Sequence, residues 1–270
     1  MADRRFIDDL ADTWSALAAL GRQLEPGEWE LPTECPGWQV RDHYAHVVGT
    51  ESTLLGRPSP PAGPAASHVR NQLGELNEAW VEHWRSRPLE DLQGELAAVT
   101  AHRLSSLAAM TDEQLDKPGW SPVGEVPYAT FMGIRVMDCW IHEQDVRQAT
   151  GRRWRLEGPV AATSLDRLLS SLGYVVGKRV APAEGTVVRV RVTGPPGRDV
   201  TLVVRAGRAV PLHTTAVTAG GPAPAVTLFM PADIYVRLAA GRLRPAGAPV
   251  QMEGDRELGD AIVANLAHVP

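Results

Sequence analysis

Residues 135–147 combine polar groups with a helical spacing that suits metal binding. Asp138, His142 and Asp145 stand at positions i, i+4 and i+7, which stacks three polar side chains on one face of a helix among apolar neighbours. A carboxylate and an imidazole one turn apart can both reach one ion, and an imidazole from a facing helix would complete a three-ligand site. A fourth coordination position would then stay open for water or substrate.

The facing imidazole is expected from residues 41–46, where His46 lies on a second helix. Asp42, four residues earlier, is on the same helical face and could orient the His46 ring as an outer carboxylate. Two ordinary interpretations stay open. A single interior histidine is often a hydrogen-bonded core residue, and an Asp/His pair at i, i+4 is often only an ion pair.

The two cysteines offer weaker candidates. Cys35 precedes a helix in the segment TECPGW, a position that can lower a thiol pKa, but a small buried residue that fixes the start of the helix is the favoured interpretation. Cys139 has apolar neighbours and is expected to pack in the core. Two cysteines cannot build a disulfide framework, and the chain lacks a nucleophile elbow, a Walker loop and a dinucleotide fingerprint.

The elements that must position these residues fall into two regions. Apolar periodicity predicts five helices in the first region, at 6–24, 39–55, 69–84, 89–110 and 128–150, with a loop at 117–128. The second region predicts a helix at 163–177, a hairpin at 186–207 around Gly-Pro-Pro-Gly, strands near 209–214, 225–229 and 250–254, and helices at 231–242 and 255–267. The pattern predicts a two-domain α+β chain: a helical bundle over residues 1–158, then a small α/β domain with an antiparallel sheet over residues 159–270.

Charge also changes between these regions. Residues 1–158 carry 15 basic and 24 acidic groups, a net charge of −9, whereas residues 159–270 carry 12 and 8, a net charge of +4. The net charge of −5 gives no basic excess for a nucleic-acid partner. No apolar run of about 20 residues predicts a membrane span, and the acidic start does not resemble a signal peptide. We therefore expect a cytoplasmic protein, either a monomer or a dimer.

Three segments resemble the mycothiol-dependent maleylpyruvate isomerase family. They are TECPGWQVRDHYAHVVG at 33–49, RVMDCWIHEQDVR at 135–147, and the pair LAAGR at 238–242 and VQMEGD at 250–255. The first is the most specific of the three and the last is diffuse, and the resemblance spans nearly the whole chain. The resemblance implies a DinB-like four-helix bundle followed by a domain similar to sterol carrier proteins.

The resemblance also implies a divalent metal, usually zinc, held by His46, Asp138 and His142, the same three residues that the helical-face argument selects. The characterised isomerases of the family carry Glu where this chain has Asp138, so Glu143 or Asp145 could assist the shorter side chain. This difference leaves the reaction more open than the site.

The implied chemistry joins this metal to a thiol. A zinc ion with three protein ligands and an open position can bind an external thiol and deprotonate it, and the thiolate can attack an electrophilic carbon. The family's cosubstrate is mycothiol, so the chain is expected to be an S-transferase or isomerase acting on a small electrophile. Arg237 and Arg242 are the candidate catalytic contacts for an anionic substrate, with solvated surface arginines as the alternative. The alternative function is a non-catalytic small-molecule or lipid-binding protein with a structural metal.

Overall fold

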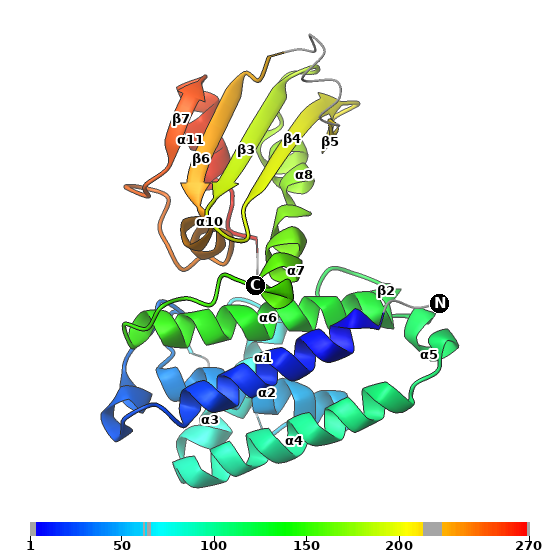
Figure 1. The fold of residues 1–270 in the computed structure, drawn as a ribbon, viewed down its shortest axis with the longest axis vertical. Coiled ribbons are helices and arrows are strands. Elements are labelled where there is room, and N and C mark those ends of the chain that lie inside the picture. Colours follow the sequence, from blue (N-terminus) through cyan, green and yellow to red (C-terminus); the bar gives the residue numbers. More distant parts are fainter. Residues whose placement is uncertain (1–3, 62, 64–65, 213–222, 269–270) are drawn as a thin grey trace. The chain divides into compact units, whose positions relative to one another are not determined.

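The chain divides into two compact units, Met1–Arg155 and Leu156–Pro270, in a computed structural model that describes residues 4–61, 63, 66–212 and 223–268. The division falls at residue 155 rather than at 158. The first unit is helical and the second contains the sheet (Figure 1), so the predicted α+β fold class is confirmed.

The first unit is built on long helices that pack side by side. Helix α1 packs on α4 and α6, while α2 packs on α3, α4 and α6 (Figure 1). Their apolar faces meet in a core where Leu10, Leu17, Val47, Leu92 and Val136 are fully buried. The helices are α1 (Arg5–Gly21), α2 (Val40–Leu54), α3 (Gln72–Arg85), α4 (Leu89–Ala109) and α6 (Tyr128–Ala149), with the short helices η1 (Pro26–Glu30) and α5 (Asp112–Asp116) between them.

The segment predicted as a plain loop is more ordered than expected. Residues 117–128 contain a short antiparallel ladder of β1 (Pro118–Gly119) and β2 (Val126–Pro127). A tight turn connects these two strands. Gly124 in this turn has a φ of +104°, a conformation that favours glycine. Local apolar periodicity carries no signal for strands of two residues.

The second unit has a five-stranded sheet in the order β5-β4-β3-β6-β7, with α8, α10 and α11 packed against it. The predicted hairpin forms β3 and β4, and in β3 the buried Val188, Val190 and Val192 alternate with more exposed residues. The sheet is not purely antiparallel as predicted, because β6 pairs with β3 in parallel. The strands are β3 (Val187–Thr193), β4 (Arg198–Arg205), β5 (Arg208–Pro211), β6 (Val226–Pro231) and β7 (Gln251–Gly254).

The helices of this unit also differ in detail from their predictions. The one expected at 163–177 begins earlier, with Pro159 at its first position, and divides into α7 (Pro159–Leu169), α8 (Leu172–Tyr174) and the π-helical segment η2 (Val175–Val180). Helices α10 (Ala232–Ala239) and α11 (Arg256–Ala264) lie within their predicted ranges. The strand expected near 209–214 is β5, and its last two predicted residues lie outside the described part of the chain.

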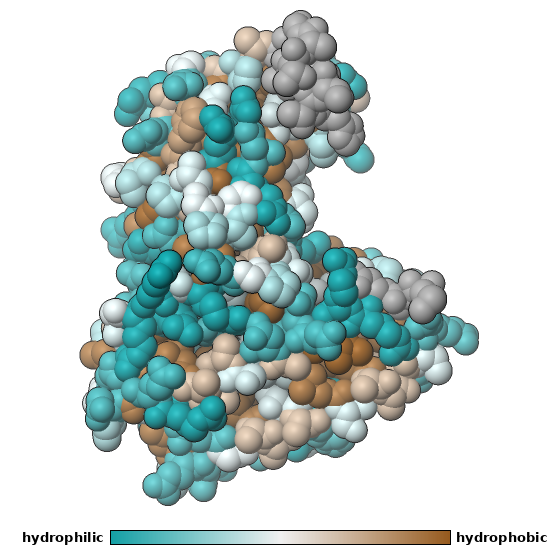
Figure 2. Space-filling view, in the orientation of Figure 1, coloured by the Kyte–Doolittle hydropathy of each residue, from teal (hydrophilic) through white to brown (hydrophobic). Residues whose placement is uncertain are grey.

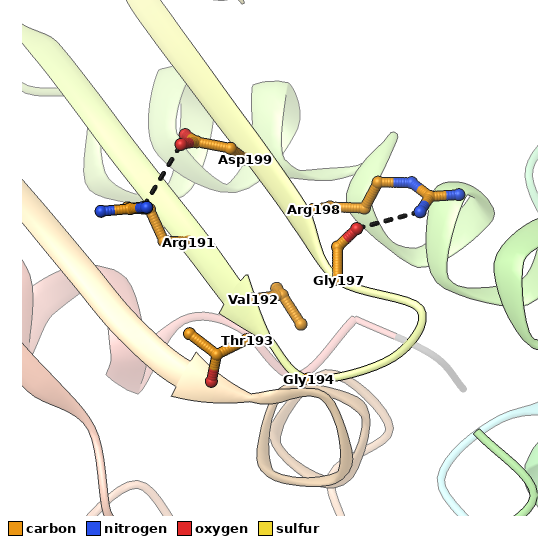
Figure 3. Close-up of a pocket in the computed structure, with 7 residues that line it drawn as sticks. All are labelled: Arg191, Val192, Thr193, Gly194, Gly197, Arg198 and Asp199. Atoms are coloured by element: carbon orange, nitrogen blue, oxygen red, sulfur yellow. Dashed lines mark hydrogen bonds and ion pairs between the residues drawn. The ribbon is translucent and has the colours of Figure 1, made fainter. Parts of the chain in front are cut away.

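The end of the β3–β4 hairpin lines an open pocket of about 430 Å³ (Figure 3). Its charged groups are engaged within the unit: Arg191 pairs with Asp199 at 3.3 Å, and Arg198 pairs with Asp166 at 2.6 Å. None of the described helices has the length and apolarity to cross a bilayer. The face drawn in Figure 2 mixes hydrophilic and hydrophobic residues.

Close approach of α2 and α3 depends on a glycine. Gly49 of α2 faces Trp80 of α3, and a Cβ at Gly49 would overlap Cβ and Cγ of that tryptophan. Gly133, in α6, has no such neighbour within 4 Å of an added Cβ. Close packing of the helices therefore requires a glycine at position 49 but not at position 133.

We expect Gly49→Ala to destabilise the protein by about 1–3 kcal/mol, because the added methyl overpacks a close helix contact. Gly133→Ala is the matched control and should stabilise it by about 0.5–1 kcal/mol, since alanine is the better helix former. Urea unfolding of both variants gives the two free energies. Equal effects would contradict the assigned role of Gly49.

Candidate metal centre

Helices α2 and α6 pack together and bring His46, Asp138 and His142 to one place. Each offers a ligand atom within 4.8 Å of the other two. His46 Nε2 lies 3.1 Å from Asp138 Oδ2, and His142 Nε2 lies 3.6 Å from Asp138 Oδ1. Ligand atoms on a tetrahedral ion with bonds of about 2.0–2.1 Å lie about 3.3 Å apart, so these separations suit one shared cation.

The site is buried on its histidine side and more open at the carboxylate. The side chains of His46 and His142 are 5% and 7% exposed, whereas that of Asp138 is 23% exposed. Burial lowers the pKa of His46 to about 4, against the opposite effect of Asp138, so its ring is neutral at pH 7 and presents a lone pair. Among the described residues, its buried Nδ1 has no hydrogen-bond partner. An ion would bind Nε2, the nitrogen that faces Asp138, and Nδ1 would then carry the ring proton.

His142 also belongs to a second three-residue cluster. His43, His142 and Asp145 are also close enough to form a three-residue ligand group. The Nδ1 atoms of the two histidines are 2.8 Å apart, which is a hydrogen-bond distance and shorter than the separation expected for two ligands of one ion. Asp145 Oδ2 lies 3.3 Å from His142 Nδ1. This cluster therefore supports the ring of His142, and the ion-sized arrangement is the one around Asp138.

A buried charge network adjoins Asp138. Arg135 forms an ion pair with Asp138 and donates from Nε to Glu51 Oε1 at 3.0 Å. Arg103 Nε donates to Glu51 Oε2 at 2.8 Å, and all three side chains of this Glu51 group are at most 5% exposed. Burial would raise the pKa of Asp138, but Arg135 and the two histidines hold it well below its usual range. Counted together with Asp145, which contacts the histidine rings, the cluster has three carboxylates and two guanidinium groups, a formal charge of −1.

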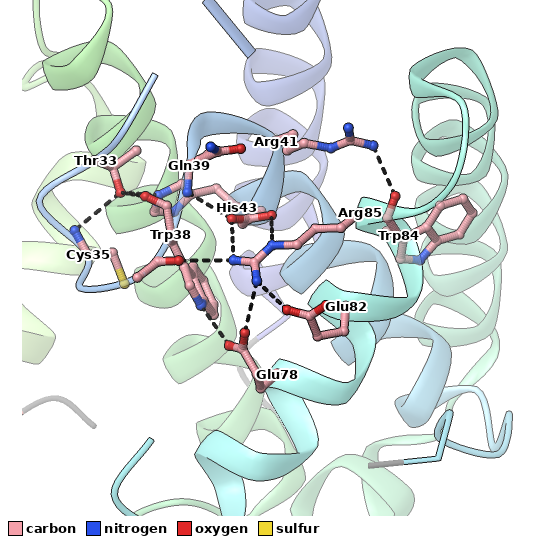
Figure 4. Close-up of polar contacts among 12 residues, drawn as sticks. Thr33, Cys35, Trp38, Gln39, Arg41, His43, Glu78, Glu82, Trp84 and Arg85 are labelled. Atoms are coloured by element: carbon pink, nitrogen blue, oxygen red, sulfur yellow. Dashed lines mark hydrogen bonds and ion pairs between the residues drawn. The ribbon is translucent and has the colours of Figure 1, made fainter. Parts of the chain in front are cut away.

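Trp38 covers the three histidine rings. Its ring centroid lies 5.4 Å from those of His43 and His46 and 5.6 Å from that of His142. The indole Nε1 donates to Glu78 Oε2 at 3.1 Å, which ties the turn before α2 to α3 (Figure 4). The rings are thereby shielded from water on the Trp38 side.

The same turn is fixed by Arg85 of α3. Its Nη2 donates to Gly37 O at 2.9 Å, and its Nη1 to Glu78 Oε1 at 3.2 Å (Figure 4). Gly37 has a φ of +80°, and a Cβ there would overlap the ring of His68, which itself contacts Glu78 at 3.0 Å. Glycine is therefore required at this position.

The predicted role of Asp42 is wrong. Its carboxylate does not orient His46: it accepts from the Gln39 N–H at 2.8 Å and from Arg85 Nε and Nη2 at 3.0 and 2.7 Å. At the third position of α2 it completes a capping box, so the helix start and the arginine take both of its oxygens.

The other two acidic candidates on α6 have different partners. Asp145 contacts the ring of His142, whereas the carboxylate of Glu143 is bound by Arg147 and Arg155 and does not join the site. Cys139 is buried, as predicted, and accepts from Trp14 and Arg135, and burial raises its thiol pKa to about 12. Cys35 is half-buried, so both interpretations of it stay open.

The predicted substrate contacts lie in the second unit. Arg237 is on α10, and Arg242 follows that helix and donates from Nη1 to Ala240 O at 2.9 Å. Their catalytic role stays a prediction.

Sequence reasoning missed His43, Trp38, Arg135 and Glu51 as parts of this site. His43 could have been found, because it precedes His46 by three residues and so shares its helix face. Arg135 stands three residues before Asp138 in the same way. The contact between Glu51 and Arg103 joins α2 to α4, and no spacing rule connects those positions.

Comparison with known proteins now identifies the family. Residues 10–147 match the family described as mycothiol maleylpyruvate isomerase N-terminal domain, and the chain belongs to that family, as predicted. An uncharacterized protein of Mycobacterium tuberculosis strain H37Rv is 30% identical over 205 residues, which cover 71% of this chain and 74% of that protein. A second uncharacterized protein of the same strain is 28% identical over 156 residues, 56% of this chain and 70% of that one.

Two solved structures share the fold. A crystal structure of mycothiol-dependent maleylpyruvate isomerase superposes with a TM-score of 0.59 at 14% identity, covering 92% of each chain. A mutant of an enzyme of that name gives 0.56 at 14% identity, covering 88% of this chain and 89% of the other. At this identity the likeness shows a common fold.

We expect Asp42→Asn to lower the free energy of unfolding by about 2–3 kcal/mol, because charge-assisted bonds to Arg85 and the helix cap are weakened. Its zinc affinity should stay at the wild-type value, since Asp42 does not contact His46. Asp138→Asn should instead weaken zinc binding, because it removes the charge of a proposed ligand. Urea unfolding and a zinc titration against a chelator measure the two quantities, and loss of zinc binding in Asp42→Asn would restore the role first predicted for it.

Proposed function

We propose that this chain is a metal-dependent enzyme that uses a low-molecular-weight thiol, mycothiol, to attack a small electrophile as an isomerase or S-transferase. Residues 1–158 would act as the DinB-like metal-binding domain, and residues 159–270 as a sterol-carrier-like domain that contributes substrate contacts. Support comes from the family of the chain and from the fold that it shares with a mycothiol-dependent isomerase.

The observation that carries the proposal is the convergence of two imidazoles and one carboxylate within 4.8 Å. Two nitrogen donors and one oxygen donor suit zinc and leave a fourth position for an exogenous ligand. Bound there, a divalent metal lowers the pKa of a coordinating thiol and so supplies a nucleophile at neutral pH. His46, Asp138 and His142 would hold the ion, and the partly exposed side of Asp138 is where a cosubstrate would approach.

Charge balance supports an anionic partner in that position. The carboxylates of Asp138, Glu51 and Asp145 and the guanidinium groups of Arg103 and Arg135 sum to −1, so a divalent cation makes this cluster +1 and a single monoanion makes it neutral. Uncompensated buried charge is costly, which favours binding a thiolate over a neutral thiol. Arg135 contributes here by holding positive charge beside Asp138, and Trp38 by shielding the histidine rings.

We expect the purified protein to carry one divalent ion per chain. His46→Ala and His142→Ala should each abolish stoichiometric binding, because two remaining ligands hold zinc poorly. His102→Ala, at an exposed position on α4, is the control and should retain the ion. Elemental analysis after mild purification measures all four proteins, and a metal-free wild-type protein would end the proposal.

Arg135→Met should affect cation and anion in opposite directions. Removing one positive charge should tighten zinc binding and weaken mycothiol binding, each by about tenfold or more, as expected for a charge acting in a partly buried site. Arg135→Lys keeps the charge and should stay close to wild type. Chelator competition and calorimetric titration of the zinc-loaded proteins with mycothiol measure the two affinities.

Parallel changes in both affinities would contradict the charge argument. A wild-type protein that is stabilised by apolar ligands, with no response to metal or thiol, would instead support a non-catalytic binding role.

A further inference from the structure

We propose that His43 is a positioning residue: it accepts the Nδ1 proton of His142 and holds that ring so that its Nε2 faces the metal site. The inference rests on the proposed metal centre and deepens it. His43 is fully buried on α2, and it contacts both His142 of α6 and Thr33 of the turn that precedes α2.

The first step concerns the two ring nitrogens that face each other. His43 Nδ1 and His142 Nδ1 are 2.8 Å apart. At this distance they share one proton, because two N–H groups pointing at each other would repel. One ring therefore donates and the other accepts, and the surroundings decide which.

Asp145 favours the proton on His142. Its Oδ2 lies 3.3 Å from His142 Nδ1 and 3.6 Å from His43 Nδ1, so the carboxylate stabilises the nearer N–H more strongly. If His142 Nδ1 carried no proton, its lone pair would face the negative carboxylate, which is unfavourable. His142 consequently donates from Nδ1, and His43 accepts at Nδ1.

Thr33 completes the chain from the other side. A neutral His43 that accepts at Nδ1 carries its proton on Nε2, which lies 2.9 Å from Thr33 Oγ1. The threonine hydroxyl in turn donates to the carbonyl of Trp38 at 3.2 Å. Every donor in the series His142, His43, Thr33, Trp38 carbonyl thus meets an acceptor.

This proton arrangement determines what the other ring nitrogen of His142, Nε2, can do. With Nδ1 of His142 bonded to His43, Nε2 is the ring nitrogen left for an ion, and it lies 3.6 Å from Asp138 Oδ1, too far for a hydrogen bond. That nitrogen is the one that would bind the metal. Outer partners of this type typically change metal affinity by about 10–100-fold when they are removed.

The test exploits two amides that mimic different nitrogens of a histidine. Asn at position 43 places its amide near the original Nδ1 and can accept from His142, whereas Gln places it near Nε2 and keeps only the Thr33 contact. We expect His43→Gln and His43→Leu to weaken zinc binding by about 10–100-fold, and His43→Asn to stay within about threefold of wild type.

Zinc affinity is measured by chelator competition, and the cobalt-loaded proteins report ligand geometry through their visible absorption. Equal losses in all three variants, or no loss in any of them, would overturn the positioning role. If a variant at position 43 does not fold, Thr33→Val tests the same chain with an isosteric change, and it should weaken zinc binding while Thr33→Ser does not.

A nitrogen-15 NMR spectrum of the zinc-loaded wild-type protein shows which ring nitrogen of each histidine is protonated. A purely structural role of His43 would not determine this result. We expect His142 protonated on Nδ1 and His43 protonated on Nε2, and the opposite assignment would overturn the inference. Failure of the metal proposal itself looks different, because wild type and His142→Ala would then bind zinc equally poorly.

Discussion

The packing of α2 against α6 is the constraint on which the rest of the first unit depends. It sets the rings of His46 and His142 with centroids 4.6 Å apart and places Asp138 between them. Polar groups brought together in a buried place must be paired or bind a ligand, because leaving them unsatisfied is costly. The surrounding contacts meet that requirement. Asp145 and His43 contact Nδ1 of His142, and the charge of Arg135 neutralises that of Asp138.

A second layer of ion pairs holds this arrangement in place without touching the ligand atoms. Glu51 joins Arg103 of α4 to Arg135 of α6, so three helices are tied through one carboxylate. Arg85 does the equivalent for the turn before α2, where it binds Asp42, Glu78 and the carbonyl of Gly37. Such groups are expensive to bury singly and are tolerated because each has several partners. Trp38 depends on that turn for its place over the histidine rings.

The sequence contained enough to predict the long helices and the hairpin, because each rests on a local pattern. The pairing of His46 with Asp138 and His142 needed the further assumption that their two helices face each other. His46 lies on α2, Asp138 and His142 lie on α6, and helical spacing fixes which side chains of one helix share a face. Asp42 shows where this reasoning fails: its i, i+4 spacing to His46 was real, but its position at the helix start gave its oxygens a stronger use. The parallel pairing of β3 with β6 and the contact of Glu51 with Arg103 are long-range, and no local pattern encodes them.

The aspartate at position 138, where the family resemblance leads one to expect glutamate, can also be understood from these contacts. Losing one methylene shortens the reach of the carboxylate, yet its two oxygens still face different rings, at 3.1 Å from His46 Nε2 and 3.6 Å from His142 Nε2. Arg135, three residues earlier on α6, pairs with the oxygen nearer to His46. A shorter side chain held by an arginine has fewer rotamers to lose on binding an ion than a longer, free one. An ion held here would have a positive charge close beside its carboxylate ligand.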